Sequence, residues 1–390
     1  MILLCVAVAL QSPVDSISLD QALERARAVR GSVTAAAASV AEARAAFRTA
    51  GAIPNPTVSY SHTESTPRNH FLVDQPLEWL LRRGSDRSAA RSGVERALAD
   101  SSSAVAGLVR DVRAAFYRAR ASRLAESLVR AQAGLADSVA RLAGARLRAG
   151  DISLLEQEQA AQEAARARQS AAIAREAARI DEAELARAIA WEGVPPTPTG
   201  ALDAGVDQVP DTVTDIAALP AVRIAVADSA AAAAQAVSVG RARVPFPTVQ
   251  AGAEWGDESQ PGTLGVIGLA VPFPLWNLGG GTAAEAQARA ARSAALAREA
   301  RLDGVRQLRQ ARIHLEETAA RARFDRDSIL PGAASLRGRA LKAYLAGETG
   351  IFPVLDALRG ERDASLAAVQ DQLAFQEALA DWYALTGYAQ

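Results

Sequence analysis

The side chains that most often carry out chemistry are scarce in this chain and lie far apart. It has three histidines and one cysteine among 390 residues. His62 and His70 flank one polar loop and would supply only two ligands, whereas a structural zinc site needs about four. His314 stands alone in a charged stretch. We therefore predict no resident metal ion and no cofactor.

One glycine run resembles a functional motif in part. Gly279-Gly280-Gly281 lies between a predicted strand and a predicted helix, where a phosphate-binding loop would stand. The Lys-Ser/Thr pair that such a loop needs is missing, and a turn from strand to helix accounts for the glycines. No group of serine, cysteine and histidine indicates a nucleophile either. We expect that the protein is not an enzyme.

Composition excludes another class. The chain has 43 basic and 44 acidic residues, a net charge of -1, so no general field attracts nucleic acid. Aromatic residues make up 5% of the chain, which is too few for a thick core. Long, thin helices packed through alanine fit this composition better.

The N-terminus resembles a secretory signal. The apolar run Ile2–Leu10 is too short to span a bilayer, but it suits a signal over residues 1–12 with cleavage near Ala7-Val8-Ala9. Whether Cys5 is a lipid anchor stays open. No other segment approaches about 18 uninterrupted apolar residues. We therefore expect any membrane crossing to use strands.

Residues 85–190 form the longest regular pattern in the chain. Apolar side chains recur at helical spacing from Val94 to Leu142, without a proline. Gly150 is the expected stop because glycine adopts the left-handed conformation cheaply, and Asp151 or Ser153 can cap the returning helix. The pattern predicts two long helices joined at a tip.

Short alternating segments precede this hairpin. Val58 and Tyr60 alternate with polar residues, which predicts a strand over about 56–62 with one apolar and one polar face. A second strand is expected over about 70–76. Near the strand ends, Trp79, Trp255, Trp276 and Tyr60 suit either an interfacial belt or packing under the strands.

The same order of elements then occurs again. A first repeat over 18–191 and a second over 221–388 are separated by a Pro/Gly/Asp linker at 192–220. The second repeat has strands over about 247–255 and 263–271 and a hairpin over 282–385, which Pro331 should bend and whose tip is Gly347. Ala149-Gly150-Asp151 matches Ala346-Gly347-Glu348 at the two tips.

Two strand pairs are too few to seal a membrane pore. The smallest membrane barrels need about eight strands, and an open edge in lipid leaves backbone groups unpaired at several kcal/mol each. Several chains must therefore combine. Three chains would supply about twelve strands.

This order of elements resembles the TolC-type outer-membrane factors over the whole chain after the signal. Asn55-Pro56, Gln75-Pro76-Leu77-Glu78 and the run from Val271 to Asn277 resemble the cobalt-zinc-cadmium resistance branch. The resemblance implies a mainly α fold with a small β part, in which a trimeric 12-stranded β-barrel is continued by an α-helical barrel. It also implies a location in the outer membrane that extends into the periplasm.

The resemblance further implies a passive exit duct. Its partners would be outer-membrane lipid, two further copies, a periplasmic adaptor and an inner-membrane pump of the RND type. Heavy-metal cations are the favoured cargo, with multidrug export or type I secretion as alternatives. A soluble periplasmic coiled-coil adaptor is the alternative from another class, although an adaptor would have one hairpin between compact β domains.

The resemblance also places a constriction at the far end of the helical tunnel. By position, one family aspartate corresponds to Pro353 and another to Asp356, while a locking arginine corresponds to Thr349 and its acidic partner to Glu156. Three copies of Asp356 would form a ring whose repulsion is on the order of 0.5 to 3 kcal/mol per pair. The alternative is that Asp356 caps or solvates an exposed helical face.

Overall fold

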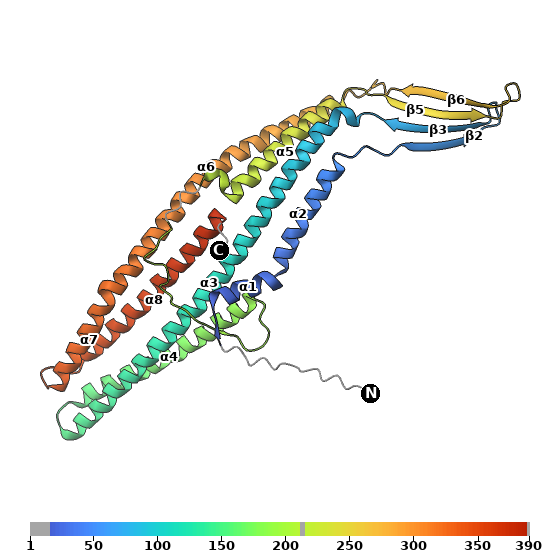
Figure 1. Ribbon diagram of the computed structural model, residues 1–390. Coiled ribbons are helices and arrows are strands. Elements are labelled where there is room, and N and C mark those ends of the chain that lie inside the picture. The colour runs from blue at the N-terminus through green and yellow to red at the C-terminus, as the bar shows by residue number, and fades with distance from the viewer. Residues whose placement is uncertain (1–15, 211–214, 388–390) are drawn as a thin grey trace, which may run out of the picture. The chain divides into compact units, whose positions relative to one another are not determined.

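The computed structural model describes residues 16–210 and 215–387 (Figure 1). The expected signal over 1–12, with Cys5, lies outside these residues. The described chain separates into two compact units, and each contains parts of both sequence repeats. One unit holds residues 34–103 and 214–305, and we call it the strand unit. The other holds the remaining described residues, and we call it the tip unit.

The strand unit joins a four-stranded sheet to helices. The strands β2 (Thr57–His62), β3 (Asn69–Pro76), β5 (Thr248–Trp255) and β6 (Thr263–Ala270) are antiparallel and lie in the order β2-β3-β5-β6. Helix α2 (Gly31–Thr49) precedes β2, and the short η1 (Ile216–Ala218) and α5 (Pro220–Ala242) precede β5. The N-terminal parts of α3 and α6 follow the two strand pairs.

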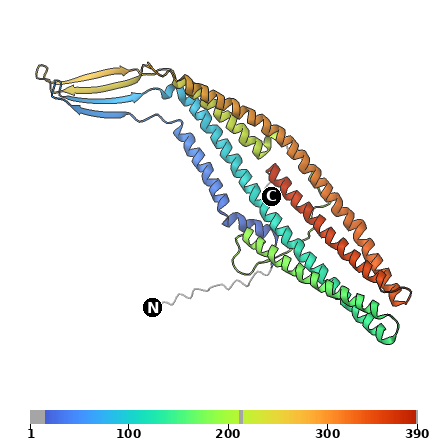
Figure 2. The same cartoon turned by 180° about the vertical axis from the view of Figure 1, so that it is seen from behind.

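The tip unit contains two helical hairpins. The first hairpin consists of α3 (Trp79–Ala149), whose N-terminal part belongs to the strand unit, and the antiparallel helix α4 (Leu154–Ala188). Helix α6 (Gly280–Phe324), a π-helical turn η2 (Asp325–Ile329) and α7 (Leu330–Leu345) form the first arm of the second hairpin, and α8 (Phe352–Thr386) returns. Figures 1 and 2 both show α3 beside α4 and α7 beside α8.

Small side chains let these helices approach closely. Between α3 and α4 one buried cluster consists of Val129 and five alanines. A larger cluster, nearer to α1 (Leu19–Val29), is centred on Phe116 and Tyr117, whose rings meet edge to face at 5.4 Å. Alanine-rich packing between thin helices is what the composition predicts.

Several boundaries differ from the sequence analysis. The first long helix starts at Trp79 instead of residue 85. Before the first strand pair the first repeat has two helices, α1 and α2, because the backbone of Arg30 between them is extended. Within the linker, β4 (Thr197–Pro198) pairs with β1 (Ser16–Ile17) in parallel, a contact across the sequence that no local pattern indicates.

Helix α5 is the one described helix that is long and apolar enough to cross a membrane by length and composition. A single such helix is weak evidence, and α5 carries charged residues that bond helix α3. Its Asp228 accepts a hydrogen bond of 2.9 Å from Arg96 of α3. Arg223 lies one turn before Asp228. These bonds attach α5 to α3 within the strand unit, while only 22% of its apolar stretch is buried.

Candidate functional site

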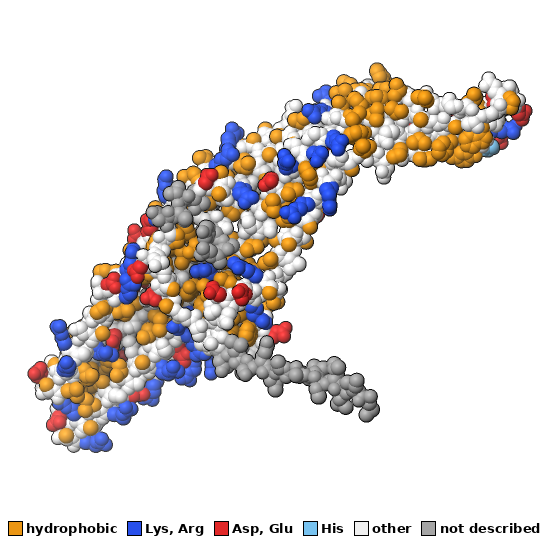
Figure 3. Space-filling view, in the orientation of Figure 1, with side chains coloured by type: hydrophobic (Ala, Val, Ile, Leu, Met, Phe, Trp, Pro, Cys, Tyr) orange, Lys and Arg blue, Asp and Glu red, His pale blue; other side chains and the backbone are white. Residues whose placement is uncertain are grey.

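One face of the sheet is apolar across all four strands. One row of register partners across this face consists of Val58, Val73, Ala251 and Ile267. The next row on the same face contains Tyr60, Phe71 and Ala253. The side chain of Ile267 is 88% exposed, and Figure 3 shows hydrophobic side chains gathered over the strands. A broad exposed apolar face on antiparallel strands is typical of contact with lipid or with a protein partner.

The opposite face is polar and linked by hydrogen bonds between strands. Gln250 donates its side-chain N–H to Asp74 at 2.8 Å, and His70 lies 3.1 Å from a carboxylate oxygen of Glu254. A sheet with one apolar and one polar face fits a barrel wall between lipid and a water-filled lumen.

The two histidines of the first strand pair do not come together. Ser61 is the register partner of His70, so His62, the next residue of β2, points to the opposite face from His70. The His62 ring bonds Asn69 at 2.9 Å instead. Within the described residues, no three His, Cys, Asp or Glu side chains gather in a way that would hold a metal ion.

Both outer edges of the sheet lack a neighbouring strand within the described chain. β2 pairs only with β3, and β6 pairs only with β5. β6 also carries exposed apolar residues at Leu264, Ile267 and Leu269. An apolar edge with open backbone groups is a template for another strand.

Aromatic side chains lie at both ends of the sheet. At the loop end, Tyr60 and Trp255 stack with their ring centroids 6.2 Å apart. At the helix end, the segment after β6 exposes Phe273 by 80% and Trp276 by 94%. These aromatic residues lie at the two ends of the sheet, where a sheet that spans a bilayer would cross the two membrane–water interfaces. Contact with the membrane stays a prediction.

The two hairpin tips have the same backbone geometry. Gly150 and Gly347 have φ values of 81° and 77°, in the left-handed region that glycine adopts without strain. At the first tip, Gly150 N–H donates to Leu147 at 3.0 Å, and the next residue donates to Arg146 at 2.9 Å. Gly347 and its following residue make the matching bonds at 3.1 and 2.9 Å.

Side chains also join the two tips. Arg146 of α3 donates a hydrogen bond of 2.9 Å to the carbonyl of Tyr344, and its guanidinium lies 4.7 Å from the centre of the Tyr344 ring. Tyr344 is fully buried and packs with Ile351, Val354 and Leu355. The sequence analysis missed Arg146, because its partner lies about 200 residues away in the other hairpin.

Glu156 forms part of the start of α4. Its carboxylate accepts the backbone N–H of Ser153 at 3.0 Å, and its own N–H donates to the Ser153 hydroxyl at 3.3 Å. This capping box lowers the pKa of Glu156, mainly through the Ser153 N–H, with further effects from the Ile351 N–H and the charge of Arg146. The pattern Ser-x-x-Glu is a local signal for this arrangement.

Asp356 lies on the first turns of α8 and is exposed. The neighbouring Val354, Leu355 and Leu358 are buried against the hairpin, so Asp356 points away from their core. Arg359, one turn further on, is held at 2.8 Å by Glu163 of α4. The structure therefore brings Asp356 and Glu156 to the same end of the tip unit but gives them different surroundings. Their role in a constriction stays a prediction.

A groove of about 670 Å³ lies beside the tips, between α4 and α8. Leu155 and Phe352, both well exposed, line it together with Arg166 and Arg359. Glu158 also lines the groove, and Arg359 is already paired with Glu163, so it is the exposed apolar side chains that suit the docking of an amphipathic helix.

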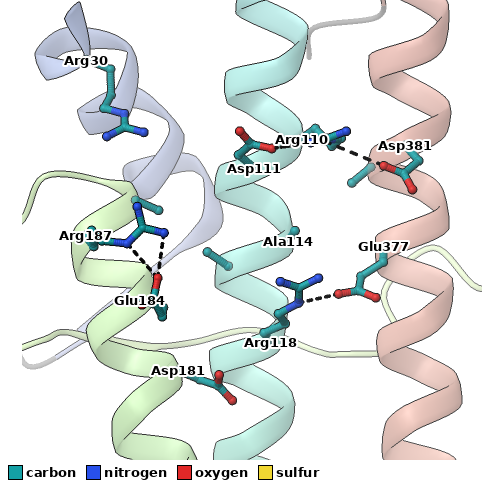
Figure 4. A pocket seen from close by; sticks show the side chains of 13 residues that line it. Arg30, Arg110, Asp111, Ala114, Arg118, Asp181, Glu184, Arg187, Glu377 and Asp381 are labelled. Atoms are coloured by element: carbon teal, nitrogen blue, oxygen red, sulfur yellow. Dashed lines mark hydrogen bonds and ion pairs between the residues drawn. The ribbon is translucent and has the colours of Figure 1, made fainter. Parts of the chain in front are cut away.

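A second pocket, of about 500 Å³, lies along α3 between α4 and α8 (Figure 4). Arg118 donates to Glu377 at 2.6 Å, and Arg110 lies between Asp111 at 2.9 Å and Asp381 at 3.9 Å. These opposite charges compensate one another over a floor of alanines. Sequence reasoning missed the pocket because its charges come from separate helices.

Known proteins share both the sequence and this arrangement. The chain is 29% identical over 357 residues to the cobalt-zinc-cadmium resistance protein CzcC of Cupriavidus metallidurans, which covers 88% of this chain and 83% of CzcC. It superposes on crystal structures of CusC with a TM-score of 0.80, over 94% of this chain and 91% of CusC, at 15% identity. The chain therefore has the fold of these outer-membrane channels.

Two further solved channels agree with this chain in fold. VceC from Vibrio cholerae gives a TM-score of 0.75 at 19% identity, over 95% of this chain and 97% of VceC. The open state of the MtrE outer-membrane channel from Neisseria gonorrhoeae gives 0.75 at 16% identity, over 95% and 89%. No family model matches the chain.

Proposed function

We propose that this chain is an outer-membrane factor, the exit duct of a tripartite efflux pump. It performs no chemistry of its own and works by geometry, as a sealed wall in the outer membrane and a helical passage into the periplasm. The observation that carries the proposal is the four-stranded sheet, which has one apolar face, one polar face and two open edges.

The open edges support a homotrimer. In lipid, an unpaired edge costs several kcal/mol for each backbone group, so the edge of β6 must meet β2 of another copy. Three copies of a four-stranded sheet give about twelve strands, above the minimum of about eight. A soluble adaptor gains nothing from so broad an apolar face.

The groove at the tips supports an adaptor as partner. Its exposed apolar side chains, Leu155 and Phe352, suit an amphipathic helical hairpin. An inner-membrane pump of the RND type and heavy-metal cargo are supported by the likeness to CzcC, a protein named for cobalt, zinc and cadmium resistance.

Growth of a deletion strain tests the cargo. A strain that lacks this chain but keeps its adaptor and pump should become sensitive to cobalt, zinc and cadmium, and the chain supplied in trans should restore growth. Sensitivity to drugs alone would assign the duct to multidrug export. Loss of a secreted protein alone would assign it to type I secretion.

We further propose that Asp356 narrows the closed end of the duct, where three exposed carboxylates would form a ring. Asp356→Ala should raise single-channel conductance in planar bilayers and weaken cation selectivity. Glu348→Ala is the matched control, since it removes an exposed carboxylate from the turn of the same hairpin without changing α8. Equal conductance of Asp356→Ala and the unaltered channel would remove Asp356 from the constriction.

A further inference from the structure

A pocket of about 320 Å³ lies at the helix end of the sheet, where α3 and α5 meet the segment after β6. Its lining contains Phe273 with the two prolines that flank it, Arg82 of α3, and Arg243 at the end of α5. All of these residues belong to the strand unit. The pocket therefore places two guanidinium groups beside an exposed apolar segment.

Each of the two arginines is held by the rest of the chain through its Nε atom. Nε of Arg82 donates to the hydroxyl of Ser238 at 3.2 Å and lies 3.8 Å from Asp86. Nε of Arg243 donates to the carbonyl of Leu278 at 2.9 Å. The terminal nitrogens of both side chains meet no acceptor among the described residues. Two fixed guanidinium forks with free N–H groups suit an oxyanion such as a phosphate group.

The surroundings of the pocket are positively charged. Arg241 donates only to a backbone carbonyl of α3, at 3.0 Å, and Arg83 lies 5.6 Å from the centre of the Trp79 ring. Neither of them pairs with a carboxylate in the described part of the chain. The opposing charges are Glu78, which lines the pocket, and Asp86. Four arginines therefore stand against two acidic residues.

The pocket adjoins the apolar face of the sheet. Leu269 lies two residues after Ile267 on β6, so the two side chains point to the same face. Exposed apolar side chains continue beyond the strand at Val271, Phe273 and Trp276. Figure 3 shows hydrophobic side chains gathered where the helices meet the sheet, with basic side chains beside them. Because Phe273 also lines the pocket, a ligand bound there reaches the apolar face.

We propose that this pocket binds the phosphate group of an anionic phospholipid, with Arg82 and Arg243 as the residues that hold it. The two guanidinium forks donate to the phosphate oxygens, and the acyl chains lie against Phe273 and the apolar face of the sheet. The inference rests on the proposed function, since only a sheet that spans the membrane brings this pocket to the lipid headgroups.

The charge around the pocket selects the class of lipid. A zwitterionic phospholipid also has a phosphate group, but its ammonium group would enter a region in which arginines outnumber acidic residues. An anionic headgroup such as phosphatidylglycerol brings no cation of its own. Clusters of basic residues at a membrane surface attract anionic lipids for this reason. Free phosphate would satisfy the arginines but would leave the apolar side chains beside them uncovered.

Native mass spectrometry of the full-length protein in detergent tests the site. Phosphatidylglycerol and phosphatidylcholine are offered at equal concentrations, and the affinity for each is measured. Phosphatidylglycerol should bind more tightly by a factor of at least about five, the effect of one arginine near an anionic surface. Arg243→Gln should lower this preference about fivefold. Equal affinities of the unaltered protein for the two lipids would overturn the proposal.

Matched variants separate the pocket from general charge and from misfolding. Arg289→Gln removes an exposed arginine of α6 that pairs with Glu285 at 3.0 Å and does not line the pocket, so the preference should stay unchanged. Glu78→Gln removes the opposing charge from the pocket and should raise the preference, which a damaged fold would not do. A loss in Arg289→Gln as large as in Arg243→Gln would refute the site, as would a loss in Glu78→Gln.

Competitors identify the ligand. Phosphatidylethanolamine that binds as tightly as phosphatidylglycerol would show that charge does not select the lipid. Displacement of the lipid by glycerol phosphate at equal concentration would assign the pocket to a soluble phosphate compound, and displacement by a polyglutamate peptide would assign it to an acidic protein segment. Each of these results would contradict the proposal.

Reconstitution into nanodiscs separates a failure of this inference from a failure of the proposed function. A chain that does not enter nanodiscs of phosphatidylcholine would count against the exit duct. A chain that enters them but shows no preference for phosphatidylglycerol would remove the lipid site alone.

Discussion

The two hairpins of the tip unit turn in the same way but reach their tips differently. Each has a left-handed glycine, Gly150 or Gly347, with the same two backbone hydrogen bonds behind it. In the first hairpin, the arm that leads to the tip is α3, which is unbroken from Trp79 to Ala149. In the second hairpin, this arm includes η2 and α7, where Pro331 interrupts the ladder of α-helical backbone hydrogen bonds. The two repeats therefore share the turn, whereas their arms differ.

The returning helices differ as well. Helix α4 starts with a capping box formed by Ser153 and Glu156. Helix α8 starts at Phe352 without a side-chain cap and has Pro353 in its first turn. In place of a local cap, the second tip has the buried ring of Tyr344 with Arg146 over it. Both tips share this buried core, and the first tip has a local side-chain cap in addition.

The largest expected effect comes from removing that core. Tyr344→Ala should destabilise the tip unit by about 3–5 kcal/mol, because it empties a fully buried position. Leu345→Ala, at the adjacent exposed position, should change stability by less than about 0.5 kcal/mol. Hydrogen exchange of residues 340–360 measures both. Equal effects would mean that the second tip does not depend on its core.

The glycine turns should respond equally in the two hairpins. Gly150→Ala and Gly347→Ala force a side chain into the left-handed region, at a cost of about 1–2 kcal/mol each. Gly332→Ala, inside α7 with open space around it, should instead stabilise by about 0.5–1 kcal/mol. Thermal unfolding of the three variants makes the comparison. A cost at only one tip would contradict the equivalence of the turns.

The smallest effect should come from the cap of the first hairpin. Ser153→Ala should cost about 1 kcal/mol in the stability of α4, measured as exchange at residues 154–160. Because the folded pKa of Glu156 is lowered, its contribution is present above the unfolded value and is lost as the pH falls through the folded one. The same exchange in α8 should not change with Ser153→Ala.

Local patterns predicted much of the fold. The alternation of Val58 and Tyr60 indicates β2, and Gly150 marks the first tip, because both depend on neighbours in sequence. Ser153 was expected to cap the returning helix, and it does so. Pro331 was expected to bend the second arm, and the structure has a π-helical turn, η2, directly before α7, which contains this proline.

Contacts between distant segments were beyond the reach of the sequence. The pairing of β1 with β4 and the contact of Arg146 with Tyr344 each join residues that no periodicity connects. Asp356 is exposed, which agrees with both interpretations of this residue: a member of a carboxylate ring in the trimer, or a solvated side chain on the surface of α8. Its role depends on neighbouring copies of the chain.

A disulfide scan between β2 and β6 tests the central claim, that only several copies together close the sheet, most directly. Within one chain the two strands are three spacings apart, about 14 Å, whereas a disulfide needs Cα atoms within about 7 Å. Cysteine pairs placed along 57–62 and 263–270, in a chain with Cys5 replaced, should give covalent trimers under mild oxidation in membranes. If no pair along these strands yields more than a monomer, the edges do not meet and the exit-duct account is wrong.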